Sequence, residues 1–139
     1  MTIGTLALGI ISTSYADSVP GFLGQPQDPN AYTCFRNADG AVTNVCDATK
    51  QFCVALPVTS ATHSVQINVT APDISHNISC FAQAVNSDAR AVGISEARSP
   101  SVFGRPQVLT LSTLNVPPGG GLFACCNMAK SSWLDTINY

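Results

Sequence analysis

The chain has 139 residues, of which 45% are hydrophobic and only 10% are charged. Soluble domains average about 25% charged residues, so Ser, Thr, Asn and Gln must cover much of the surface here. The net charge is −2 and the six Lys and Arg residues form no basic run. This composition argues against nucleic-acid binding, which needs a positive footprint. The length predicts one domain with a core of its own.

Residues 1–16 contain an apolar run, Ile3–Ile11, that is shorter than the roughly 20 residues of a membrane-spanning helix. The run has the length of a signal-peptide core and small residues follow it, although no Lys or Arg precedes it. A signal peptide over residues 1–16 is the first interpretation. The alternative is a retained apolar strand, because three large residues alternate with smaller ones: Leu6, Leu8 and Ile10.

Residues 17–31 carry three prolines and two glycines. Proline cannot donate a hydrogen bond to a central strand, so this stretch is predicted to be an extended arm. Residues 32–139 are predicted to form a single β-sandwich domain, because short apolar runs separated by turn residues follow one another to the end of the chain.

Nine runs in residues 32–139 predict strands: Tyr32–Asn37, Ala41–Cys46, Gln51–Val58, His63–Thr70, Ile78–Val85, Ala91–Ser95, Gln107–Val116, Leu122–Met128 and Trp133–Tyr139. Ala38, Asp39 and Gly40 separate the first two runs and are typical of a hairpin turn. The run Ile78–Val85 is largely apolar on both faces, which predicts a central strand.

No segment of the sequence has apolar residues recurring every three or four positions, as an amphipathic helix would, so almost no helix is expected. The regular spacing of short strands predicts an all-β fold, a small antiparallel β-sandwich of immunoglobulin-like or jelly-roll type. A closed barrel is the alternative architecture.

The even number of cysteines favours three disulfides formed in an oxidising compartment over buried free thiols in the cytosol. Two of them are adjacent, and successive strand residues point to opposite faces. Each of these two is therefore expected to bond a different distant segment, although the sequence leaves the pairing open. The six predicted disulfide cysteines are Cys34, Cys46, Cys53, Cys80, Cys125 and Cys126.

No catalytic residue, metal ligand or cofactor site is predicted. His63 and His76 are separated by a whole predicted strand and have no metal-ligand spacing, so polar strand ends are the favoured interpretation. The cysteine spacing fits no common zinc motif, and the sequence lacks a GxSxG elbow. Asn37–Gly40 resembles part of an EF-hand calcium loop. The loop needs Asp at its first position and Glu at its twelfth, where this chain has Phe35 and Cys46, so a hairpin turn is favoured.

Two features of the sequence bear on carbohydrate, either attached to the chain or bound by it. Asn68 and Asn77 each begin an N-glycosylation sequon, so both are possible glycosylation sites, although chance matches are expected in a chain this rich in Asn, Ser and Thr. Tyr32, Trp133 and Tyr139 are the residues considered for an aromatic platform, but packing into the core or a terminal strand is favoured for them. A surface or carbohydrate ligand therefore remains unidentified from the sequence.

The favoured function is a non-enzymatic, secreted, periplasmic or cell-surface β-sandwich with a structural or binding role. A sharper version is a filament or coat subunit that forms homo-oligomers by strand addition, with Leu6, Leu8 and Ile10 as the subunit contact. The alternative is a small secreted hydrolase or enzyme inhibitor with a hidden site. A pocket holding His63 or His76 beside a carboxylate and a serine would favour that alternative.

Overall fold

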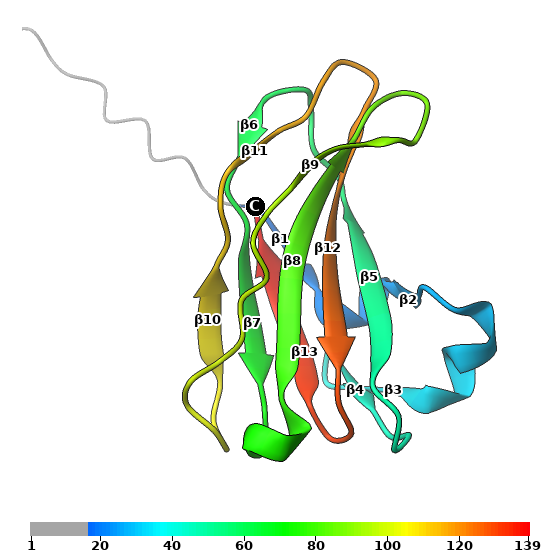
Figure 1. Ribbon diagram of the computed structural model, residues 1–139, viewed down its shortest axis with the longest axis vertical. Coiled ribbons are helices and arrows are strands. Elements are labelled where there is room, and N and C mark those ends of the chain that lie inside the picture. Colours follow the sequence, from blue (N-terminus) through cyan, green and yellow to red (C-terminus); the bar gives the residue numbers. More distant parts are fainter. Residues whose placement is uncertain (1–16) are drawn as a thin grey trace, which may run out of the picture.

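The computed structural model describes residues 17–139 as two stacked antiparallel sheets (Figure 1). The six-stranded sheet has the order β10-β7-β13-β4-β3, with β1 paired to β13. Its strands are β1 (Ser18–Pro20), β3 (Phe35–Ala38), β4 (Ala41–Asn44), β7 (Gln66–Thr70), β10 (Gln107–Thr110) and β13 (Trp133–Asn138). The predicted disulfide-stapled antiparallel β-sandwich is confirmed.

The five-stranded sheet has the order β2-β5-β12-β8-β9. Its strands are β2 (Gln25–Pro26), β5 (Lys50–Leu56), β8 (Ile78–Val85), β9 (Ala91–Ile94) and β12 (Gly121–Met128). A two-stranded strip pairs β6 (Thr62–His63) with β11 (Leu114–Asn115), and the helices in this range are three short 3-10 turns, η1 (Gly21–Leu23), η2 (Pro29–Cys34) and η3 (Ile74–His76).

Alternation along each strand builds the core between the sheets. In β8, every second residue is at most 1% exposed, whereas the residues between them are partly exposed. The same period of two in β5 and β12 sends one set of side chains inward and the other outward, as the pleat of a strand requires. The six-stranded sheet closes the core from the other side with Ile67, Val69, Leu134 and Ile137, all 0% exposed.

The predicted hairpin is present, with β3 paired to β4 in antiparallel register. Asp39 and Gly40 occupy its turn with φ of 50° and 87°. Two consecutive positive φ values are what a two-residue hairpin turn of the favoured hand requires, and Asp-Gly adopts them at low cost.

Three predicted strands differ from the observed ones. The strand expected over His63–Thr70 is divided, since His63 belongs to β6 and Gln66–Thr70 forms β7 in another sheet. The strand expected from Tyr32 begins only at Phe35, because Pro29–Cys34 forms η2, which Asp28 caps by accepting a hydrogen bond from the Asn30 N–H at 2.9 Å. The strand expected over Gln107–Val116 is two strands with different partners, since β10 pairs with β7 and β11 with β6.

The strip of β6 and β11 explains that break. Leu114 and Val116 are 9% and 2% exposed, so the strip buries its apolar residues over one end of the sandwich, next to β8 and β9. If β10 continued as one straight strand, Leu114 and Val116 would extend beyond the core and would not cover its end.

Strand β12 is bonded covalently to both of its neighbours. Cys125 forms a disulfide with Cys53 of β5, and Cys126 forms one with Cys80 of β8. The register places each pair directly opposite across the ladder. Because Cys125 and Cys126 point to opposite faces, one disulfide lies on the outer face of the sheet and the other lies in the core.

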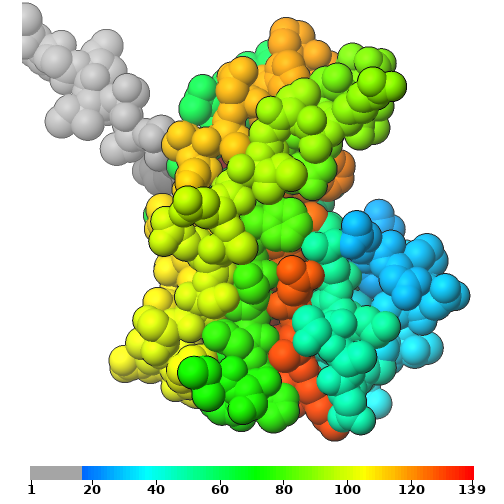
Figure 2. Space-filling view, viewed as in Figure 1, coloured from blue at the N-terminus to red at the C-terminus, as the bar shows by residue number. Residues whose placement is uncertain are grey.

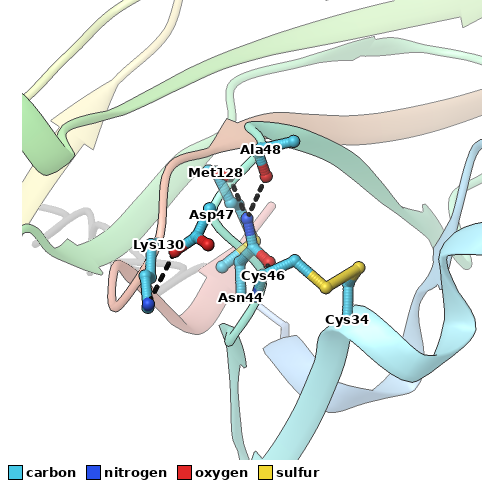
Figure 3. The surroundings of a disulfide bond; sticks show 7 residues. All are labelled: Cys34, Asn44, Cys46, Asp47, Ala48, Met128 and Lys130. Atoms are coloured by element: carbon cyan, nitrogen blue, oxygen red, sulfur yellow. Dashed lines mark hydrogen bonds and ion pairs between the residues drawn. A yellow bond between two sulfur atoms is a disulfide. The ribbon is translucent and has the colours of Figure 1, made fainter.

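The third disulfide, Cys34–Cys46, joins the end of η2 to the turn after β4 (Figure 3). Beside it, the fully buried Asn44 amide donates to the carbonyl oxygens of Ala48 and Met128 at 2.9 and 2.8 Å, and its Oδ1 accepts from the Cys46 N–H at 2.9 Å. A buried amide with all these partners satisfied fixes the turn against the end of β12.

The segment of residues 17–34 crosses from one sheet to the other. Strand β1 pairs with β13 of the six-stranded sheet, and β2 pairs with β5 at the edge of the five-stranded sheet. Gly21 lies against the backbone of Leu134 and Gly24 against the backbone of Cys53, where a Cβ would collide. The crossing therefore requires glycine at both positions. Leu6, Leu8 and Ile10, and the predicted signal peptide, lie outside the described residues.

Candidate ligand-binding groove

A groove of about 740 Å³ lies on the outer face of the five-stranded sheet. In Figure 2, β12 in orange is visible on this face between β8 in green and β5 in blue-green. The groove is lined by apolar, amide and small side chains from both ends of the chain: Gln27, Gln51, Cys53, Phe81, Gln83, Val85, Ala89, Ile94, Ser95, Ala97, Phe123, Cys125 and Asn127.

Three cross-strand rows form the floor. Asn127 lies opposite Gln51, and Cys125 lies between Cys53 and Phe81 in the next row. In the third row, Phe123 is opposite Gln83, which in turn is opposite Ile94 of β9.

The rows are separated by two residues along each strand, so the floor from Phe123 to Asn127 is about 14 Å long. The phenyl rings of Phe123 and Phe81 come from diagonal positions on adjacent strands, which are about 7–8 Å apart at their backbones. The floor therefore has amides in its first row, a phenyl ring beside the disulfide in its second, and a phenyl ring beside the Gln83 amide in its third.

The walls come from segments distant in sequence. Gln27 follows β2 and donates its N–H to the Gln51 carbonyl at 3.0 Å, which fixes the arm at one side. On the other side, the Ser95 hydroxyl accepts from the Ala82 N–H at 2.8 Å and donates to the Glu96 carbonyl at 3.2 Å. Ser95 is thus a structural anchor for the segment after β9 that forms this wall.

A tight turn brings Ala89 to one end of the groove. The Asn86 Oδ1 accepts from the N–H groups of Asp88 and Arg90, both at 3.0 Å, and Ala89 has φ of 59°. An asparagine that bonds its own following backbone is a common way to stabilise such a turn. The end of the groove is therefore shaped by backbone geometry.

The chemistry of the lining is uniformly uncharged. Within residues 17–139, the side chains that line the groove include no carboxylate, amine, guanidinium or imidazole, and the two cysteines are disulfide-bonded. Such a surface can donate and accept hydrogen bonds through amides and can contact apolar faces through phenyl rings. It has no group of its own that would move a proton at neutral pH.

Neither histidine lies in the groove. The His76 Nδ1 is 3.0 Å from both carboxylate oxygens of Asp73, on the exposed turn of η3, and this hydrogen bond lowers the pKa of Asp73. The His63 Nε2 is 2.7 Å from the Thr59 carbonyl oxygen. Among residues 17–139, no three His, Cys, Asp or Glu side chains come together in a way that could hold a metal ion.

The two sequons lie in different surroundings. Asn68 is in the middle of β7, paired on one side with Val108 and on the other with Thr136, and its Oδ1 is buried without a hydrogen-bond partner. Asn77 precedes β8, and its Oδ1 accepts from the Ile78 N–H at 2.8 Å.

The aromatic residues considered for a platform do not gather. Trp133 and Tyr139 bracket β13 and are separated by about 20 Å of extended chain. Tyr32 belongs to η2, where its hydroxyl donates to the Gln25 Oε1 at 3.3 Å. A shared sugar platform made of these three is excluded by the length of β13 alone.

Phe81 and Phe123 are the aromatic residues that the sequence interpretation missed as site residues. The alternation in Ile78–Val85 puts Phe81 and Val85 on one face, and this apolar face contributes to the prediction of a central strand. Strand β8 is indeed central, but Phe81 is partly exposed and faces the groove. An apolar second face on a central strand was therefore the available signal of a binding surface.

Comparison with known proteins defines the class of fold. The sequence matches no protein-family model and no curated protein. Among solved structures, the fold resembles the C-terminal CBM6 of LamC, a laminarinase from Zobellia galactanivorans, with a TM-score of 0.55 and 9% identity over 89% of this chain and 98% of that one.

A second resemblance is to the CBM36-1 domain of a xylanase from the hindgut metagenome of Trinervitermes trinervoides. The TM-score is 0.53 and the identity 10%, over 89% of this chain and 95% of that one. At such low identity, both comparisons show a shared β-sandwich fold. Within the described residues, no helix has the length and apolar character needed to cross a membrane.

Proposed function

We propose that this protein is a non-catalytic carbohydrate-binding domain and that the groove on the five-stranded sheet holds a glycan chain. The observation that carries the proposal is the lining itself, in which the phenyl rings of Phe81 and Phe123 lie among four amide side chains. Sugars present apolar C–H faces and many hydroxyls, so they fit a site with aromatic faces and a few placed polar groups.

The size of the groove suits a short stretch of polysaccharide. A volume of about 740 Å³ falls in the usual range of ligand sites, about 300–1,000 Å³. The two solved structures of similar fold are named as carbohydrate-binding modules of glycan-degrading enzymes. That likeness supports the proposal without carrying it, because one fold serves many functions.

The disulfides support a compartment outside the cytosol. Three disulfides persist in oxidising surroundings and are rare in the cytosol, so we place the protein outside the cytosol, where polysaccharides are accessible. The hydrolase alternative gains no support from residues 17–139, since neither His63 nor His76 lines the groove. The filament hypothesis depends on Leu6, Leu8 and Ile10, outside the described residues.

Affinity electrophoresis in gels containing hydroxyethyl cellulose, laminarin or arabinoxylan tests the proposal. We expect at least one polysaccharide to retard the protein, and Phe123→Ala to weaken that binding roughly tenfold or more, as truncation of a central aromatic contact does. Val108→Ala is the matched control, because Val108 is an exposed apolar residue of the other sheet. Equal binding by wild type and Phe123→Ala would contradict the proposal, as would no retardation by any glycan.

A further inference from the structure

We infer that the groove selects uncharged glycan chains and rejects acidic ones. This inference rests on the proposed function and names the chemistry of the ligand. It starts from the polar groups of the lining, which are amides: Gln27, Gln51, Gln83 and Asn127. An amide offers both a donor and an acceptor without charge, so it pairs with a hydroxyl in either direction.

In residues 17–139, none of the Lys and Arg side chains lines the groove. Lys50 precedes Gln51 on β5, and alternation sends their side chains to opposite faces of the sheet. The Lys130 ammonium is 2.7 Å from the Asp47 carboxylate, and the Arg98 guanidinium is 3.6 Å from the Glu96 carboxylate. The remaining Lys and Arg residues are Arg36, Arg90 and Arg105, and none of them lines the groove.

Desolvation then decides between ligands. A uronate or sulfate entering the groove loses part of its hydration and meets no opposite charge, which is strongly unfavourable. A sugar hydroxyl exchanges water for an amide hydrogen bond at nearly equal free energy, and the phenyl contacts of Phe81 and Phe123 then favour binding. The net charge of −2 adds a weak long-range repulsion of polyanions, which salt would screen.

Polysaccharides that share a backbone and differ in charge provide the test. Hydroxyethyl cellulose is compared with carboxymethyl cellulose, and laminarin with sulfated laminarin, by isothermal titration calorimetry. We expect each acidic member to bind roughly tenfold more weakly than its neutral partner. The affinity for the neutral member should change by less than about twofold between about 20 and 500 mM NaCl, because no ion pair is screened.

Charge insertion sharpens the test. Gln83→Glu and Gln83→Lys place opposite charges at the same position of the floor, and both are expected to weaken neutral-glycan binding by a similar factor, because either charge must be desolvated. The same two changes at Gln66, an exposed residue of β7 on the other sheet, serve as the control and should leave binding unchanged. Opposite effects of Glu and Lys at Gln83 would overturn the inference.

The outcomes separate the inference from the proposed function. Tighter binding of carboxymethyl cellulose or sulfated laminarin, lost in Phe123→Ala, would keep the groove as a glycan site and overturn its selection of neutral chains. Failure of all four polysaccharides, and of arabinoxylan, to bind would overturn both.

Discussion

The two faces of the five-stranded sheet are built from alternate residues of the same strands, yet they differ in composition and in exposure to solvent. In β12, the inward residues Leu122, Ala124, Cys126 and Met128 are at most 1% exposed. The outward residues, from Gly121 to Asn127, combine a glycine, a phenyl ring, a disulfide and an amide. The inner face is uniform because it must pack, whereas the outer face is mixed because it meets solvent and, as proposed, a ligand.

Each face of the sheet also has one disulfide, so the two faces can be compared by removing one disulfide at a time. Cys80–Cys126 is in the core and Cys53–Cys125 is on the groove floor. Both close long loops, with sequence separations of 46 and 72 residues. By constraining the unfolded chain, the two disulfides should therefore contribute similar amounts to the free energy of unfolding. Any further difference in stability between variants that lack one or the other then reflects the different surroundings of the two faces.

The inner disulfide should give the largest effect on stability. The double variant Cys80→Ala/Cys126→Ala is expected to lose about 4 kcal/mol from the chain-entropy term and about 1 kcal/mol more from the space left in the core. Urea unfolding followed by far-UV circular dichroism measures the total. Where folded protein is obtained, its glycan affinity should equal that of the wild type, and a loss of affinity would show that the two faces are coupled.

The outer disulfide should separate stability from binding. Cys53→Ala/Cys125→Ala is expected to lower the free energy of unfolding by about 4 kcal/mol, with a smaller packing loss because Cys53 is partly exposed, and to weaken glycan binding because part of the floor is removed. Urea unfolding and calorimetric titration of the same sample measure both quantities. Unchanged affinity in this variant would contradict the placement of the ligand over the disulfide.

Adjacent residues of β12 sharpen the comparison at the level of single side chains. Leu122→Ala is expected to lower the free energy of unfolding by about 3 kcal/mol, since Leu122 is 1% exposed. Phe123→Ala should cost about 1 kcal/mol or less, because its ring is partly exposed. Thermal unfolding of both variants tests this order, and a larger loss for Phe123 would mean that its ring supports the core.

The smallest effect is expected on the other sheet. Asp135 lies at the β-bulge of β13, where the register shifts between Leu134 and Thr136, and burial raises its pKa although Thr70 donates to it at 3.3 Å. The folded state therefore holds this proton more tightly than the unfolded state. Asp135 therefore lowers the free energy of unfolding as the pH rises from 3.8, the ordinary pKa of an aspartate, through the raised pKa of the folded state.

Asp135→Asn removes that titration and should stabilise the protein at neutral pH by about a few tenths of a kcal/mol, since the group is half-exposed to solvent. Urea unfolding midpoints of wild type and variant, compared on both sides of the raised pKa, measure it. The two proteins should converge at the acidic end of the range. A variant less stable than the wild type at neutral pH would show that the carboxylate has a favourable partner.

The strands were predictable where alternation was regular, as in Ile78–Val85, whose bounds the structure reproduces. The opposite directions of Cys125 and Cys126 also follow from the pleat, but their partners depend on strand order, which the sequence does not contain. The break between β10 and β11 was hidden because Leu, Val and Thr suit one long strand as well as two short ones.

The groove was harder to predict for a related reason. Alternation showed that Phe81 shares a face with Val85, but it did not show which face of the sheet would be left uncovered. The walls come from Gln27 and Ser95, 68 residues apart in the chain, and only the folded arrangement places them on opposite sides of Phe123. Concavity is a property of tertiary structure, so local sequence patterns do not reveal it.

The ends of the described chain have a mechanical consequence. The Tyr139 N–H donates to the Asp17 carbonyl at 3.0 Å, and Ser18 lies opposite Asn138, so a force that separates the two ends peels β1 from β13 one hydrogen bond at a time. Such unzipping needs little force compared with shearing a whole strand. The β5–β12–β8 unit lies outside this pair of strands and is cross-linked on both sides, so β1 and β13 would separate first and the sheet that carries the groove would stay folded under tension.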